Sequence, residues 1–144
     1  MPELSIVPVR RMFEAFHTGD LSHVHEFISV DYLNYEALDD EEDRATRRGP
    51  DEFTATVTWL RSVYTNLRFE EQEVIVAGEK VVVRSIMSGQ QTGEFMGIPP
   101  TGRTIAQQQV HIFRVVDGKV VEHRAVRDDL GMLRQLGVIH FGPS

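Results

Sequence analysis

The sequence predicts an α+β fold in which helices come first along the chain and a curved antiparallel sheet follows them. In the first half, apolar residues recur every three or four positions, which is the spacing of an amphipathic helix. After Asn66 the chain becomes rich in β-branched residues, and short turn signals divide this half into strands. We therefore expect the helices to cover one face of the sheet.

Length and composition favour one domain over residues 1–144. Hydrophobic residues make up 41% of the 144 residues and charged residues 26%, which are the proportions of a globular protein. A chain of this length buries about 70% of the surface of its unfolded form, so its core can enclose a small ligand. The sequence contains no cysteine, which excludes a disulfide framework, a thiolate nucleophile and a Cys-bound metal.

The net charge and the hydropathy of the sequence limit the kinds of partner that we expect the protein to bind. The net charge of −7 argues against nucleic acid, because clustered Lys and Arg carry phosphate binding. The N-terminus lacks the basic and apolar regions of a signal peptide, and no apolar stretch approaches the length of about 18 residues that spans a membrane. We expect a cytoplasmic protein with no membrane partner.

Three segments of the first half have features of helices. The first is predicted from Ile6 to the stop signal Gly19, and its apolar positions are Ile6, Val9, Phe13 and Phe16. Asp20 then predicts the N-cap of a second, short helix that reaches about Ser29. A third helix begins at Gly49, with Pro50 in its first turn and an apolar stripe of Phe53, Val57, Leu60 and Tyr64.

The segment between these helices, residues 36–48, holds six acidic residues and three arginines without apolar periodicity. This composition predicts a solvated loop, and a lid over a pocket is the alternative.

Four strands are predicted at residues 67–76, 80–91, 104–116 and 119–128, followed by a helix at 129–136. Asp117-Gly118 lies between the last two strands and is a strong signal for a two-residue type I′ hairpin turn. With this turn, His111 is expected opposite Arg124. Side chains alternate along a strand, so one face is expected to carry two sets, namely Gln107, Gln109, His111 and Phe113, and Glu122, Arg124, Val126 and Asp128.

This face is unusually polar for a sheet covered by helices, so it is interpreted either as a solvent face or as a cavity with chemistry in it. Two structural alternatives stay open: Asp128 as the N-cap of the last helix, and Glu122 with Arg124 as an exposed ion pair. The six histidines do not have the spacing of metal ligands, and motifs for nucleotide binding, zinc proteolysis and serine hydrolysis are absent. We expect no metal.

Several segments, in order, resemble the SnoaL-like polyketide cyclase family, and the likeness covers about residues 6–139. They are Tyr32-Leu33-Asn34, Arg48-Gly49-Pro50, residues 93–103, 111–114 and 117–120, Glu122-His123 and residues 128–137. The resemblance implies a cone-shaped α+β barrel, in which N-terminal helices and a curved antiparallel sheet enclose an apolar cavity, and it implies a homodimer or homotetramer. It also implies a cofactor-free enzyme that closes the last ring of an anthracycline-type aromatic polyketide by intramolecular aldol condensation.

Residue by residue, the resemblance implies that Asp128 is the acid/base, with His111 and Asn34 nearby. Gln107 and Gln109 are then candidates to hydrogen-bond the developing oxyanion together with His111. The walls for a flat ligand are expected among the aromatic residues, with ordinary core packing as the alternative for each: Phe13, Phe16, Trp59 and Phe113.

One position departs from the family pattern, because His123-Arg124 stands where many members have His-Trp. An arginine there resembles the branch of the family that hydroxylates anthracycline intermediates, and Arg124 could hold an ionised substrate. A third hypothesis is a non-catalytic domain that binds a small molecule in the same cavity.

Overall fold

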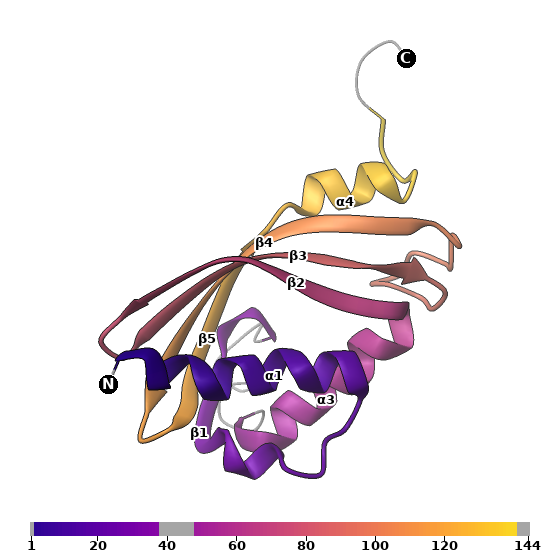
Figure 1. Cartoon of the computed structure of the whole chain (residues 1–144). Coiled ribbons are helices and arrows are strands. Elements are labelled where there is room, and N and C mark those ends of the chain that lie inside the picture. Colours follow the sequence, from indigo (N-terminus) through magenta and orange to yellow (C-terminus); the bar gives the residue numbers. More distant parts are fainter. Residues whose placement is uncertain (1, 38–47, 141–144) are drawn as a thin grey trace.

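The structure is a computed structural model that describes residues 2–37 and 48–140 (Figure 1). The predicted loop at residues 36–48, with its alternative as a lid, falls mostly outside these residues. No helix in the described ranges is both long enough and apolar enough to cross a membrane.

Two of the three helices predicted for the first half are present. The 3-10 turn η1 (Pro2–Ser5) leads into α1 (Ile6–Thr18), which ends at Gly19 with a φ of 76°, a left-handed conformation that favours glycine. Helix α3 (Gly49–Val63) has Pro50 in its first turn and Asp51 and Glu52 facing the positive end of its dipole. A short helix, α4 (Asp129–Gln135), follows the last strand.

The predicted second helix is wrong. Only the 3-10 turn η2 (Val24–Glu26) is helical there, and the chain continues as strand β1 (Ile28–Asn34), which a further 3-10 turn, η3 (Tyr35–Ala37), follows. Leu21, Val24, Phe27 and Ile28 have helical spacing over two turns, but β1 is extended and forms a ladder with another strand. Short apolar runs of this kind do not distinguish a helix from a strand.

Four further strands complete the sheet: β2 (Tyr64–Ala77), β3 (Lys80–Gln91), β4 (Thr104–Val116) and β5 (Lys119–Arg127). The strand order is β1-β5-β4-β3-β2. All neighbours are antiparallel except β1, which pairs with β5 in parallel, so the sheet is mixed rather than purely antiparallel.

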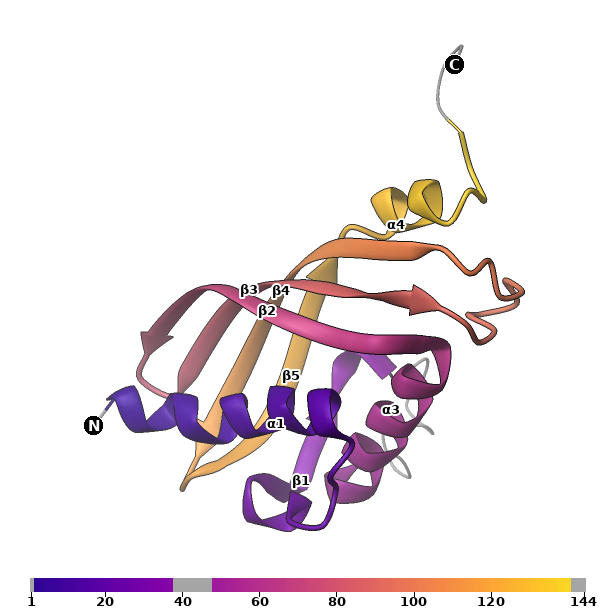
Figure 2. The same ribbon diagram turned by 45° about the vertical axis from the view of Figure 1, so that its right-hand side comes forward.

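The sheet curves over α1 and α3, which lie on its concave side, while α4 lies beyond the opposite side (Figures 1 and 2). Between helices and sheet, Val9, Phe16, Phe53 and Val57 belong to one buried apolar cluster with the inward residues of the strands. This is the expected α+β architecture, and its concave side holds the polar face of β4.

A β-bulge changes the predicted register of the last hairpin. Asp117 and Gly118 have φ angles of 51° and 76°, the positive values that a type I′ turn requires, and Val116 pairs with Lys119 as predicted. Val115 then pairs with Val120 but Arg114 with Glu122, so Val121 is an extra residue in β5. Beyond it every residue of β5 faces the side opposite to the predicted one.

Candidate active site

Three polar side chains of β4 point to the concave side at alternate positions. Gln107, Gln109 and His111 are 1%, 3% and 6% exposed, with Phe113 buried beside them. The sequence placed these four residues on one face, and they share it. Because of the bulge, their neighbours from β5 are His123, opposite Phe113, and Ala125, opposite His111.

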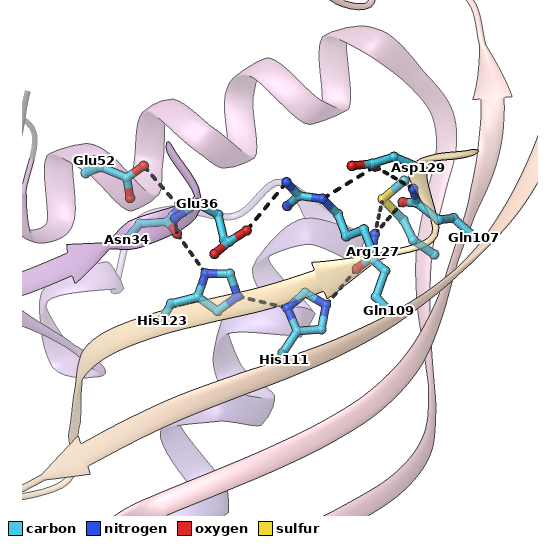
Figure 3. A network of polar contacts seen from close by, with 10 residues as sticks. Asn34, Glu36, Glu52, Gln107, Gln109, His111, His123, Arg127 and Asp129 are labelled. Carbon is cyan, nitrogen blue, oxygen red and sulfur yellow. Dashed lines mark hydrogen bonds and ion pairs between the residues drawn. The ribbon is translucent and has the colours of Figure 1, made fainter. Parts of the chain in front are cut away.

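A continuous series of polar contacts at hydrogen-bond distance runs along this face (Figure 3). Asn34 Oδ1 lies 2.8 Å from His123 Nδ1, and His123 Nε2 lies 2.8 Å from His111 Nδ1. His111 Nε2 is 2.6 Å from Gln109 Oε1. Gln109 Nε2 donates to Gln107 Oε1 at 2.8 Å, and Gln107 Nε2 donates to Asp129 Oδ1 at 3.0 Å. We call this series of five contacts, from Asn34 to Asp129, the polar chain.

The Asn34 end of the polar chain is anchored inside the protein. Its Nδ2 donates to Glu52 Oε1 at 3.3 Å, and its Oδ1 also accepts from the backbone N–H of Glu36 at 3.2 Å. Glu52, on α3, is 3% exposed and accepts from the hydroxyl of Thr56 at 2.6 Å. The other end reaches the surface, because the Asp129 side chain is 65% exposed.

Both histidines are neutral at neutral pH. Burial, followed by the positive charge of Arg127, lowers the pKa of His111 to about 4 from its ordinary value of 6.5. Burial, followed by the charges of His111 and Arg127, lowers the pKa of His123 well below 6.5. A neutral imidazole offers one nitrogen as donor and the other as acceptor, so each histidine can both donate and accept within the polar chain.

A pocket of about 230 Å³ opens next to the polar chain, between α1 and strands β2 and β3. Phe13 and Phe69 line it, and their rings also touch the His111 ring, with centroids 5.5 and 6.0 Å away. Ser85 lines the same pocket and pairs with Gln109 across β3 and β4. Its hydroxyl is buried without a hydrogen-bond partner in the described part of the chain. Arg10, Glu14, His17, Glu71 and Val83 complete the lining, so the pocket combines two phenyl rings that contact His111 with several charged side chains. His111 itself is not among the lining residues.

The predicted placement of Asp128 is wrong. Its side chain does not face Gln107; it accepts from the backbone N–H of Gly131 at 2.9 Å and caps α4, and the residue is exposed. A Cβ at position 131 would come too close to this carboxylate, so a residue larger than glycine there would make the Asp128 side chain shift. The carboxylate that Gln107 contacts is the next residue, Asp129.

The predicted placement of Arg124 is also wrong. The bulge puts Arg124 on the outer face opposite Ile112, exposed to solvent, with its guanidinium carbon 3.7 Å from the centroid of the Tyr35 ring. The alternative ion pair of Glu122 with Arg124 is not formed, since Glu122 pairs with Arg114 at 3.0 Å.

The aromatic candidates divide into three groups. Phe13 lines the pocket and Phe113 stacks 5.9 Å from His111, so both border the polar chain. Phe16 packs in the core against Phe53 and Phe69, which is the structural alternative. Trp59 is 44% exposed and stacks on Phe95, and it is not among the residues that line the pocket.

The chain belongs to the SnoaL-like polyketide cyclase family, because the model of this family matches residues 7–136. It is 42% identical to the aklanonic acid methyl ester cyclase DnrD of Streptomyces peucetius, over 90% of this chain and 88% of that protein. It is 38% identical to the nogalonic acid methyl ester cyclase of Streptomyces nogalater, over 88% and 92%. Among solved structures, TsrD of Streptomyces laurentii superposes with a TM-score of 0.79 at 28% identity, covering 92% of this chain and 96% of TsrD.

Sequence reasoning missed His123, Asp129, Ser85 and Glu52. His123 and Asp129 were assigned to the wrong side or passed over because the bulge cannot be read from the hairpin turn. Ser85 and Glu52 lie within ordinary strand and helix patterns, and only their burial distinguishes them. Among the residues that the structure describes, no three His, Asp or Glu side chains gather as metal ligands would.

Proposed function

We propose that the protein is a cyclase that closes a ring of an anthracycline-type aromatic polyketide by intramolecular aldol condensation, without a cofactor. Two relatives of 38% and 42% identity are named as cyclases of the methyl esters of nogalonic and aklanonic acid. The observation that carries the proposal is the buried, neutral pair His111–His123, with the His111 ring against Phe13 and Phe69 of the pocket lining. Such a pair can move a proton without a metal or a bound coenzyme.

In this reaction His111 acts as the acid/base. It takes a proton from the carbon next to a substrate carbonyl, and the electrons of the broken C–H bond form an enolate. The enolate carbon then forms a bond with a second carbonyl carbon of the same molecule, whose oxygen becomes an alkoxide. Return of the proton from His111 to this alkoxide completes the ring, so the product is an isomer of the substrate.

The volume of the pocket limits how much of the substrate it can hold. Pockets that hold a drug-sized ligand whole have volumes of about 300–1,000 Å³, so 230 Å³ admits only the reacting edge of a polycyclic substrate. Phe13 and Phe69 would pack against the flat rings. The Ser85 hydroxyl would donate to a substrate oxygen and stabilise the enolate, as preorganised donors do for oxyanions.

A direct test is to incubate the protein with aklanonic acid methyl ester and to identify the product by mass spectrometry and NMR. The proposal predicts a cyclised product of unchanged mass, formed equally well under labelled and unlabelled dioxygen. Incorporation of labelled oxygen would instead identify a hydroxylase, the second hypothesis from the sequence. Tight binding of the ester without turnover would identify a domain that only binds.

The structural reason for the hydroxylase hypothesis was an arginine beside His111, and Arg124 lies on the other face. The cyclase is therefore the function we carry forward. From the family resemblance we also propose a homodimer or homotetramer in the cytoplasm, which light scattering and cell fractionation would test.

A further inference from the structure

The two ends of the polar chain fix the orientation of every group between them. Asn34 Oδ1 accepts from the backbone N–H of Glu36, so this oxygen, and not the NH2 group, faces His123. We assign the proton of His123 to Nδ1, because only this tautomer donates to the buried Asn34 oxygen, and Nε2 is then an acceptor. His111 in turn carries its proton on Nδ1, which faces His123 Nε2. Nε2 of His111 then carries no proton and has a lone pair.

The Asp129 end of the polar chain fixes the orientation of the two glutamine side chains. An ionised carboxylate only accepts hydrogen bonds, so Asp129 requires the NH2 group of Gln107. The oxygen of Gln107 then faces Gln109 and requires the NH2 group of that residue. Consequently the oxygen of Gln109, Oε1, is the atom that faces His111 Nε2, at 2.6 Å.

The polar chain therefore has five contacts but only four N–H donors while both histidines are neutral and Asp129 is ionised. With this tautomer of His123 the shortfall falls on the contact between His111 Nε2 and Gln109 Oε1, which lie 2.6 Å apart; with the other tautomer it would fall between His123 Nδ1 and Asn34 Oδ1. One additional proton, placed on His111 Nε2, completes all five contacts. A second proton has no acceptor within the chain.

We propose that Asp129, through Gln107 and Gln109, keeps the Nε2 lone pair of His111 uncapped and provides the acceptor for the proton that it takes up. Asp129, Gln107 and Gln109 are positioning residues in this scheme, and Asn34 with His123 fixes the tautomer of His111. The use of this proton in catalysis rests on the proposed function. The number of protons in the polar chain and their positions do not depend on that function.

The charges around the pair limit it to one proton. Arg127 of β5 lies 3.8 Å from Asp129 Oδ1 and 3.7 Å from Glu36 Oε1, and its positive charge disfavours an imidazolium. Glu52 of α3 is the carboxylate behind Asn34. Tyr32 and Tyr64 stay neutral, since burial and the charges of Glu52 and Asp129 raise the pKa of each. The groups that touch the His111 ring from α1 and β2 are apolar, Phe13 and Phe69.

In the proposed reaction Gln109 Oε1, which lies 2.6 Å in front of His111 Nε2, moves aside, and the proton from the substrate carbon bonds to Nε2 as the C–H bond breaks and its electrons form the enolate. Gln109 Oε1 then returns to its place. The new N–H then donates to Gln109 Oε1, and this charge-assisted hydrogen bond stabilises the imidazolium. Transfer of the same proton to the alkoxide restores the neutral chain, so the residues finish the cycle as they began it.

The substitution Asp129→Asn tests the proposal because it adds the missing donor without changing the shape of the side chain. An asparagine NH2 can donate to Gln107, and both glutamines then turn, so that the NH2 group of Gln109 donates to His111 Nε2 and caps it. Asp128→Asn is the matched control: it makes the same chemical change one residue earlier, and asparagine still caps a helix.

Histidine side-chain 15N NMR provides the first readout. At pH 7 we expect the His111 Nε2 signal of Asp129→Asn to shift as that atom gains a donor, while Asp128→Asn matches the wild type. On acidification the wild-type pair should take up one proton near pH 4, and in Asp129→Asn the midpoint should fall by about one to two pH units, the value of a hydrogen bond to a charged group.

Kinetics provides the second readout. With a substrate that the wild-type protein cyclises, Asp129→Asn should lower kcat by about 10-fold or more. KM should stay within about twofold, because Asp129 does not touch the substrate. An unchanged His111 Nε2 signal in Asp129→Asn, uptake of two protons by the pair, or unfolding before any uptake would overturn the proposal. If the NMR results hold and no substrate is cyclised, the proposed function fails and the proton arrangement stands.

Discussion

Acidification is expected to destabilise the protein through His111. In the folded chain the pKa of His111 is about 4, whereas an unfolded histidine has a pKa of about 6.5. The unfolded state therefore binds the proton more readily, so the stability that the neutral, buried imidazole contributes is present above pH 6.5 and is lost as the pH falls toward 4.

The size of this loss follows from the difference of 2.5 pH units between the two values. At 1.36 kcal/mol per unit, and with His111 half protonated in the folded state at pH 4, the loss is about 3 kcal/mol. This is a large part of the stability of about 5–15 kcal/mol that is typical of a folded domain.

Urea unfolding at several values between pH 7.5 and pH 4, for the wild type and for His111→Gln, measures this loss. Carboxylates that titrate in the same range affect both proteins, so the difference between the two curves isolates the histidine. We expect the wild type to lose about 3 kcal/mol more than His111→Gln over this range. Parallel curves would refute the argument that His111 is buried in its neutral form.

Three further variants test the placement of single residues. Ser85→Ala should raise KM several-fold and change the free energy of unfolding by less than about 1 kcal/mol, because the buried hydroxyl has no described partner in the folded chain; an unchanged KM removes Ser85 from the substrate site. Arg124→Trp, which restores the commoner family residue, should leave KM within about twofold, since Arg124 lies on the outer face; weaker substrate binding would return it to the site. Asp128→Ala should cost about 1 kcal/mol of stability as a lost helix cap, measured by thermal unfolding, with kcat within about twofold; a 100-fold loss of kcat would restore Asp128 as the acid/base.

Local signals in the sequence predicted most of the fold. The helix from Ile6 to the stop at Gly19, the helix that begins at Gly49 and the type I′ turn at Asp117-Gly118 each depend on contacts between nearby residues, and each is confirmed. Strand β1 was not predictable in the same way. Its extended form depends on pairing with β5, about 90 residues further along, and its apolar spacing also fits a helix.

The site was predictable only in part, because one extra residue in β5 decides which side chains enter it. The four positions of β4 were correct, since their alternation needs no partner strand. The partners from β5 were wrong beyond Val121, where the bulge exchanges the two faces and replaces Arg124 by His123. A bulge of this kind arises from packing of the whole sheet and leaves no mark on the hairpin turn.

The role of His111 as acid/base is tested most directly by proton exchange at the substrate carbon. Aklanonic acid methyl ester would be incubated in D2O with the wild type or His111→Gln, a variant that keeps hydrogen-bonding groups but has no basic nitrogen, and deuterium uptake and ring closure would be followed by mass spectrometry and NMR. We predict that His111→Gln loses both activities by about 100-fold or more, the scale of general acid–base catalysis. Deuterium uptake and ring closure at wild-type rates in His111→Gln would contradict the account.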